Sequence, residues 1–251
     1  MLNLKENYIL EARNISKSFG NIKALQDINI YLKYNEVLGM VGDNAAGKST
    51  LLNILSGVYK PEKGNIYLES QEVVFKSPLD ARQKKIETVF QDFGLIPELD
   101  VSTNLFLGQE YYNKKLLGIK WLDKKRMRKE SLELLNDLGI KVPKVSSKAA
   151  QLSGGQQQAV AIARSIKFNP KIILLDEPTA SLSEGVVHHV LNLIDNLKEK
   201  GISIILVSHR LPDIFKVTDR IIVLRHGKIK NEKLTKDTSQ KEIIDMMVGD
   251  I

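Results

Sequence analysis

The sequence predicts an α/β fold, with a mostly parallel β-sheet covered by helices on both faces. Three short apolar runs, 37–41, 172–175 and 202–207, have the length and composition of buried strands. Amphipathic helical spacing separates these runs, most clearly in 187–197. Near the N-terminus apolar and polar residues alternate instead, which indicates an added antiparallel layer. We expect a single domain over 1–251, with a helical subdomain at about 94–165 inserted in its core.

The composition limits the classes of protein to which this chain can belong. The 251 residues include no cysteine, which excludes disulfides and thiolate metal sites. No apolar run approaches the roughly 20 residues needed to cross a bilayer, and Met1–Glu6 lacks the apolar core of a signal peptide. We therefore expect an intracellular protein. The net charge of +7 would suit nucleic acid or an anionic membrane, but interleaved acidic residues favour an ordinary solvated surface.

The N-terminal half is expected to hold short strands around one glycine-rich loop. Ile28, Ile30 and Leu32 alternate with polar residues after a turn at Gly20–Asn21. The predicted elements that follow are a strand at 37–41, a helix at 50–56 ending at Gly57, a strand at 66–68, a helix capped by Ser77 before Pro78, and a strand at 86–90 that ends at Gln91.

The C-terminal half is predicted to alternate helices with buried strands. Asp123 caps a helix that carries an apolar stripe and ends at Gly139, and Ser153 caps a helix that stops before Pro170. The remaining predicted elements are a strand at 172–175, a helix at 187–197 closed by Gly201, strands at 202–207 and 220–224, a turn at 225–228, and a last helix with the capping-box pattern of Ser239 and Glu242.

The most informative stretch lies between the strand at 37–41 and the helix at 50–56. Its residues fit the pattern G-x-x-x-x-G-K-[ST] at every fixed position; they are Gly42, Asp43, Asn44, Ala45, Ala46, Gly47, Lys48, Ser49 and Thr50. Glycines let successive N–H groups point at phosphate oxygens, and the helix adds its positive dipole end. Lys48 supplies a charge for the β- and γ-phosphates, and the Ser49 hydroxyl suits Mg²⁺. The stretch therefore predicts a P-loop NTPase core.

Two carboxylates end the apolar strand at 172–175. Asp176 and Glu177 should lie at the sheet edge where α/β folds bind ligands. Asp176 can hold Mg²⁺, directly or through water, as the acidic partner of the phosphate loop. Glu177 is free to orient or deprotonate an attacking water. A solvated strand end with two acidic residues is the alternative.

A second anion-binding segment is predicted at Leu152–Gln156. Its two glycines, Gly154 and Gly155, would expose N–H groups at a helix start, and Ser153 adds a hydroxyl. Taken alone, the segment reads equally well as an ordinary N-cap followed by glycines.

The ordered set of motifs resembles the nucleotide-binding subunit of ATP-binding cassette transporters over nearly the whole chain. The resemblance rests on 42–50, Gln91, 152–156, 172–179 and 208–209, in the family's order. It implies that two chains pack head to tail around two ATP molecules with Mg²⁺. Each ATP would lie on the phosphate loop of one chain and beneath Ser153, Gly154, Gly155 and Gln156 of the other.

The same resemblance implies roles for three further residues. Phe19 would stack on adenine, although a core aromatic is the alternative. Gln91 would contact Mg²⁺ and water and link the site to a membrane partner, with a polar strand end as its alternative. His209 would contact the γ-phosphate, where a surface histidine is the alternative; His188, His189 and His226 match no motif. Ser183 stands where the family often has Asp, which leaves that contact across the dimer open.

Details of the sequence are similar to importers of ribose, xylose and fructose. The similar segments are 93–97, 104–108, 156–160, 217–227 and 246–249. The resemblance implies permease subunits as partners, an extracytoplasmic sugar-binding protein as an indirect partner, and a position at the cytoplasmic face of the membrane. The alternative is a soluble cassette ATPase acting on ribosomes or DNA. This chain has neither the second cassette nor the long coiled-coil insertion of those types, so no nucleic acid partner is expected. The segment 152–156 argues against an unrelated kinase or GTPase.

Overall fold

The computed structural model describes residues 8–91, 94–113, 121–180 and 182–249. Its main feature is a six-stranded sheet with the order β10-β9-β3-β8-β7-β6. All neighbouring strands are parallel except β10, which pairs antiparallel with β9. The strands are β3 (Val37–Gly42), β6 (Ile86–Val89), β7 (Ile172–Asp176), β8 (Ser203–Val207), β9 (Arg220–Arg225) and β10 (Lys228–Leu234). The predicted mostly parallel sheet is confirmed.

A second, four-stranded sheet confirms the antiparallel layer expected at the N-terminus. Its order is β2-β1-β4-β5, and each neighbouring pair is antiparallel. The strands are β1 (Tyr8–Phe19), β2 (Ile22–Lys33), β4 (Lys63–Leu68) and β5 (Gln71–Val73). The first two strands have 12 residues each, so they are longer than the short strands expected there.

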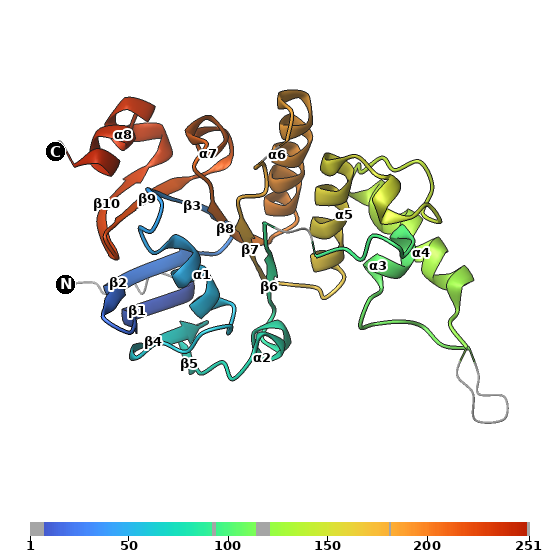
Figure 1. The fold of residues 1–251 in the computed structure, drawn as a ribbon, viewed down its shortest axis with the longest axis horizontal. Coiled ribbons are helices and arrows are strands. Elements are labelled where there is room, and N and C mark those ends of the chain that lie inside the picture. The colour runs from blue at the N-terminus through green and yellow to red at the C-terminus, as the bar shows by residue number, and fades with distance from the viewer. Residues whose placement is uncertain (1–7, 92–93, 114–120, 181, 250–251) are drawn as a thin grey trace.

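Helices cover both faces of the large sheet, as Figure 1 shows. They are α1 (Lys48–Leu55), α2 (Pro78–Gln83), α3 (Val101–Leu105), α4 (Lys124–Asp137), α5 (Gly154–Ile166), α6 (Glu184–Glu199), α7 (Leu211–Val217) and α8 (Gln240–Val248), with 3₁₀ turns at Ala149–Gln151 and Thr235–Asp237. Helix α5 contacts α3, α4 and α6, and so joins the helical middle of the chain to the rest. In Figure 1, α3, α4 and α5 lie on the far side of α6 from α1.

Alternate residues of each central strand enter two different hydrophobic cores. In β8, Ile204 and Leu206 pack in a core shared with α5 to α8, whereas Ile205 and Val207 pack with α1 and the small sheet. This two-residue period is the one a strand imposes when both of its faces are covered. It explains why β3 and β7, and β8 after Ser203, have no polar residue before their carboxyl ends.

Several elements differ from the prediction in ways that have a physical cause. Strand β10 was not expected because its sequence, KIKNEKL, has no fully buried residue and therefore no apolar signal. The middle of the chain is less helical than predicted, since α3 has only five residues. The capping box at Ser239 is half formed: the Ser239 hydroxyl accepts from the Glu242 N–H, but the Glu242 carboxylate binds the Thr238 hydroxyl and Lys233.

Candidate functional site

The phosphate loop forms between β3 and α1, where the motif predicts it. Lys48 is the first residue of α1, and its ammonium group donates to the carbonyl oxygens of Gly42 at 2.6 Å and Asp43 at 2.9 Å. The first N–H groups of α1 have no acceptor within the helix. Ser49 is exposed at this helix start, whereas Thr50 is half-buried. The loop can therefore offer N–H groups, a charge and a hydroxyl to a bound anion.

Two glycines of the loop are required by the backbone. Gly42 has φ +153° and Gly47 has φ +107°. A Cβ at Gly42 would lie 2.2 Å from the carbonyl oxygen of Leu224, and one at Gly47 would lie 2.8 Å from that of Ala24. Ala45 also has positive φ, at +63°, although it carries a side chain. Asp43, Asn44 and Ala45 are exposed, while Ala46 and Gly47 are buried.

Four parallel strands bring the predicted residues to one edge of the sheet. The register aligns Met40 of β3 with Val207 of β8, and Val207 with Asp176 of β7. Strand β6 continues the row, with Val89 opposite Leu175. Asp176 is the last residue of β7, and the phosphate loop, Glu177, His209 and Gln91 come at or just after the ends of these strands. Their common edge is the carboxyl end of the strands, where open α/β sheets bind ligands.

Charges at this edge influence one another. Burial lowers the pKa of Lys48, and the nearby carboxylates of Glu177, Asp176 and Asp43 act in the opposite sense. Burial raises the pKa of Asp176, the charge of Glu177 raises it further, and Lys48 lowers it. Asp176 is thus a half-buried carboxylate whose ionised form needs a cation, which makes it suitable as a magnesium ligand.

The structure brings Glu177 and His209 into direct contact. The Glu177 carboxylate bonds to Nδ1 of His209, which is itself an exposed side chain. Glu177 has a left-handed backbone, with φ +52°, and its N–H donates to the carbonyl oxygen of Val207 at 2.9 Å. This conformation is unusual for a residue with a side chain. It turns the carboxylate toward the strand end that carries His209.

A buried pair behind the site was not found from the sequence. The Thr179 hydroxyl donates to the carboxylate of Asp213 at 2.6 Å, and both residues are buried. Arg210 lies 3.4 Å from the same carboxylate. The pair joins the turn after Glu177 to helix α7. Thr179 and Asp213 are far apart in sequence and match no periodicity. The only sequence signal for the pair is that Thr179 lies in the segment 172–179 that resembles the family.

Phe19 and Gln91 lie at exposed positions. The Phe19 ring is 42% exposed and packs edge-on against Tyr59, with ring centroids 5.3 Å apart. The alternative reading of Phe19 as a core aromatic is therefore wrong. Gln91 is exposed after β6, whereas Phe93 and Ser181 of the sequence patterns lie outside the described residues. Ser183 precedes α6 as its N-cap residue and makes no side-chain capping bond.

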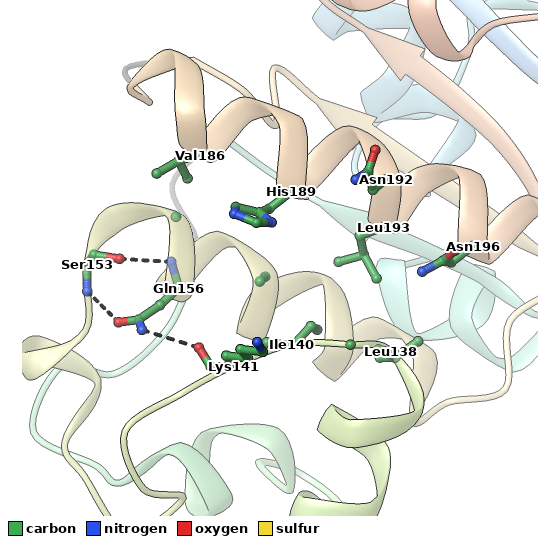
Figure 2. A pocket seen from close by; sticks show the side chains of 13 residues that line it. Leu138, Ile140, Lys141, Ser153, Gln156, Val186, His189, Asn192, Leu193 and Asn196 are labelled. Carbon is green, nitrogen blue, oxygen red and sulfur yellow. Dashed lines mark hydrogen bonds between the residues drawn. The ribbon is translucent and has the colours of Figure 1, made fainter.

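The segment 152–156 forms the start of α5. The Ser153 hydroxyl accepts from the N–H of Gln156 at 3.3 Å, and the Gln156 carboxamide oxygen accepts from the N–H of Ser153 at 3.0 Å. The carboxamide of Gln156 also donates to the carbonyl oxygen of Lys141 at 3.2 Å, as Figure 2 shows. This reciprocal capping box satisfies two N–H groups of the helix start. The predicted N-cap is confirmed.

The two glycines of this segment have different surroundings. Gly154 is exposed, and a Cβ there would lie 3.5 Å from Leu182. Gly155 is buried, and a Cβ there would lie 1.9 Å from Cγ1 of Val186. Gly155 thus lets α5 approach α6 closely, a requirement that the sequence prediction missed. In Figure 1, the start of α5 lies beyond α6 from the phosphate loop of the same chain.

Comparisons with known proteins agree with this arrangement. Residues 25–180 match the family model described as ABC transporter. The xylose/arabinose import ATP-binding protein of Sulfolobus acidocaldarius is 45% identical over 241 residues, which cover 96% of this chain and 94% of that protein. The ribose import ATP-binding protein of Caldanaerobacter subterraneus subsp. tengcongensis is 39% identical over 96% of this chain, but this match spans only 48% of that protein.

Solved structures give the same result. An ATP-binding cassette of an ABC transporter in its ADP conformation superposes with a TM-score of 0.83 and 29% identity, over 96% of this chain and 99% of that one. A dimeric cassette in a post-hydrolysis state, bound to ADP and Pi, matches with a TM-score of 0.75 and 32% identity, over 90% and 98% of the two chains. The fold, the gathered strand ends and these matches lead to one conclusion: this chain belongs to the ABC transporter family, as one of its ATP-hydrolysing cassettes.

Proposed function

We propose that this chain binds Mg-ATP between two copies arranged head to tail and drives uptake of a monosaccharide through membrane permease subunits. The observation that carries the proposal is the separation of the two anion-binding segments. The phosphate loop follows β3, while Ser153–Gln156 begins α5 on the other side of α6. One chain thus supplies half of the groups that would surround a nucleotide, and a second chain supplies the rest.

Within one half-site, each residue has a defined task. The N–H groups from Gly42 to Thr50 and the Lys48 ammonium bind the β- and γ-phosphates. Ser49, Asp176 and Gln91 would hold Mg²⁺ when it is bound. The donor set fits this ion, because Mg²⁺ is usually bound by one or two carboxylates plus substrate phosphates. When bound, the ion would supply positive charge beside the transferred phosphate. Phe19, exposed at the end of β1, stacks on the adenine ring.

Glu177 acts as the general base for hydrolysis. Its carboxylate takes a proton from water as the oxygen of that water bonds to the γ-phosphorus, and the bond from that phosphorus to the bridging oxygen breaks. His209, in contact with Glu177, holds the carboxylate in place and contacts the γ-phosphate. Ser153, Gly154, Gly155 and Gln156 of the second chain close the site.

The transport role rests on the relatives named as import ATP-binding proteins. We propose a xylose-, arabinose- or ribose-type sugar as cargo, an extracytoplasmic sugar-binding protein as indirect partner, and a position at the cytoplasmic face of the membrane. No helix among the described residues has the length and apolarity to span a bilayer. We also propose that about 94–165 forms a helical subdomain, whose segment after Gln91 docks the permease.

Reconstitution with the permease tests this function. The chain, candidate permease subunits and a sugar-binding protein from the same organism are assembled in lipid vesicles. ATP-dependent uptake of labelled xylose, arabinose, ribose and fructose is then measured, with a Lys48→Ala assembly as the inactive control. Uptake of one sugar by the wild type alone supports the proposal. Co-purification with nucleic acid in place of membrane subunits would support the soluble cassette ATPase instead.

A further inference from the structure

A cavity in the helical part of the chain borders the Ser153–Gln156 segment and lies away from the phosphate loop of the same chain. It measures about 500 Å³ and lies between α5, α6 and the turn after α4. This volume is within the range of about 300–1,000 Å³ that small-molecule sites occupy. Its apolar wall consists of Leu138, Ile140, Ala159, Val186 and Leu193.

Polar side chains of α6 face this cavity without a protein partner. His189, Asn192 and Asn196 are spaced three and four residues apart, so they follow one face of the helix. All three residues are exposed, and none of their side chains has a hydrogen-bond partner among the described residues. Figure 2 shows His189 pointing between the two helices. Imidazole and carboxamide groups both donate and accept, which suits the hydroxyl groups of a ligand.

The charge around the cavity is positive. Lys141 lines it and forms no ion pair with a described residue, and none of the described lining residues is acidic. The start of α5, with Ser153 and Gly155, also faces the cavity and contributes the positive end of the helix dipole. The neighbouring His188 provides a contrast, because its Nδ1 lies 2.8 Å from the Lys216 ammonium and its side chain does not line the cavity.

We propose that this cavity binds a small polyhydroxylated anion, such as a sugar phosphate or a sugar acid. Lys141 binds the anionic group, while His189 and Asn196 bind hydroxyls over the apolar wall. Because Ser153 and Gln156 form part of the wall, a bound anion contacts the segment that closes the nucleotide site. A bound anion should therefore change the rate of ATP turnover, because turnover depends on the position of that segment.

Calorimetry on the full chain tests the site. Glucose 6-phosphate, gluconate, glucose and inorganic phosphate are titrated with saturating ADP present, so that the phosphate loop is filled. The two sugar anions should bind at least about tenfold more tightly than glucose or phosphate, because only they use both groups of contacts. His189→Leu and Lys141→Ala should each weaken their binding by about tenfold, while His188→Leu and Lys144→Ala should not.

Turnover provides a second measurement. The sugar anion that binds should change the ATPase rate of the wild type and of His188→Leu, but not of His189→Leu. All variants should keep the wild-type rate without the anion. Failure of every sugar anion to bind, or equal binding by His189→Leu and His188→Leu, would overturn the proposed site. Binding without any effect on turnover would overturn the coupling.

Discussion

Replacing Gly155 by alanine separates two reasons for a glycine at the start of α5. The N–H groups at the start of a helix suit an anion, and they persist in Gly155→Ala. The added Cβ, however, would lie 1.9 Å from Cγ1 and 3.2 Å from Cβ of Val186. The helices must therefore move apart or Val186 must change its position. Such overpacking costs about 1–3 kcal/mol of unfolding free energy.

A matched control lies one residue earlier. Gly154→Ala has the same loss of glycine flexibility, but its Cβ would meet Leu182 at an ordinary 3.5 Å. Gly→Ala in a helix favours the folded state by about 0.5–1 kcal/mol, so this variant should be as stable as the wild type or more so. Gly155→Ala should melt about 2–4 °C lower for each kcal/mol lost, as expected for a chain of this size.

Double mutants complete the test by thermal and urea unfolding. Val186→Ala removes the atom that clashes and leaves only the 3.2 Å contact. The double variant Gly155→Ala, Val186→Ala should regain stability relative to Gly155→Ala, with a coupling energy of about 1 kcal/mol or more. The control Gly154→Ala, Val186→Ala should show none. Equal stability of Gly155→Ala and Gly154→Ala, or no rescue, would refute the packing argument.

Two further predictions concern the carboxyl edge of the sheet, and a third concerns Glu87 near the start of β6. Lys48→Ala should lose most ATP affinity in calorimetry while circular dichroism stays native, and unchanged affinity would contradict the role of the loop. Glu177→Gln should slow hydrolysis by about 10²–10⁴-fold. The same variant should form a dimer in ATP, measured by light scattering, and adding Ser153→Arg should abolish that dimer. A Glu177→Gln variant that stays monomeric in saturating ATP argues against the head-to-tail arrangement. Burial raises the pKa of Glu87 above its usual 4.5, although the hydrogen bond and charge of Arg82 lower it. The protonated carboxyl therefore contributes stability that is fully present below about pH 4.5 and is lost as the pH rises. Between pH 4 and 7, the unfolding free energy of Glu87→Gln should therefore improve relative to the wild type, and a constant difference would contradict this.

Sequence reasoning predicts the site well where strands end. Strands β3 and β7 contain only apolar residues and glycine before their carboxyl ends, and β8 does so after its first residue, Ser203. The first polar residue that ends such a run marks the edge of the sheet. Asp176 is the last residue of β7 and its first polar one, and Ser208–His209 follows β8. Parallel pairing then aligns these ends, because neighbouring strands share a register. The place of the residues thus follows from local patterns, and the contact between Glu177 and His209 follows from the pairing.

Other features depend on contacts that no local pattern records. Strand β10 is held by pairing with β9 and by the turn at His226–Gly227, and its side chains give no burial signal. Gly155 is fixed by the approach of α6, about thirty positions along the chain. The pair of Thr179 and Asp213 is likewise a tertiary contact. Predicting these features requires the helix packing first.

Backbone strain at the site follows from the same tertiary contacts. Ala45 and Glu177 both have positive φ with a side chain present, a conformation that costs about 1–3 kcal/mol and persists only where the surroundings enforce it. For Glu177 the surroundings are identifiable: its N–H donates to Val207, and the turn beyond it is held by Thr179 on Asp213. The strained turn is thus held at both ends, by β8 and by α7. This restraint keeps the Glu177 carboxylate beside His209. A turn without positive φ at the end of β7 would not direct the carboxylate there.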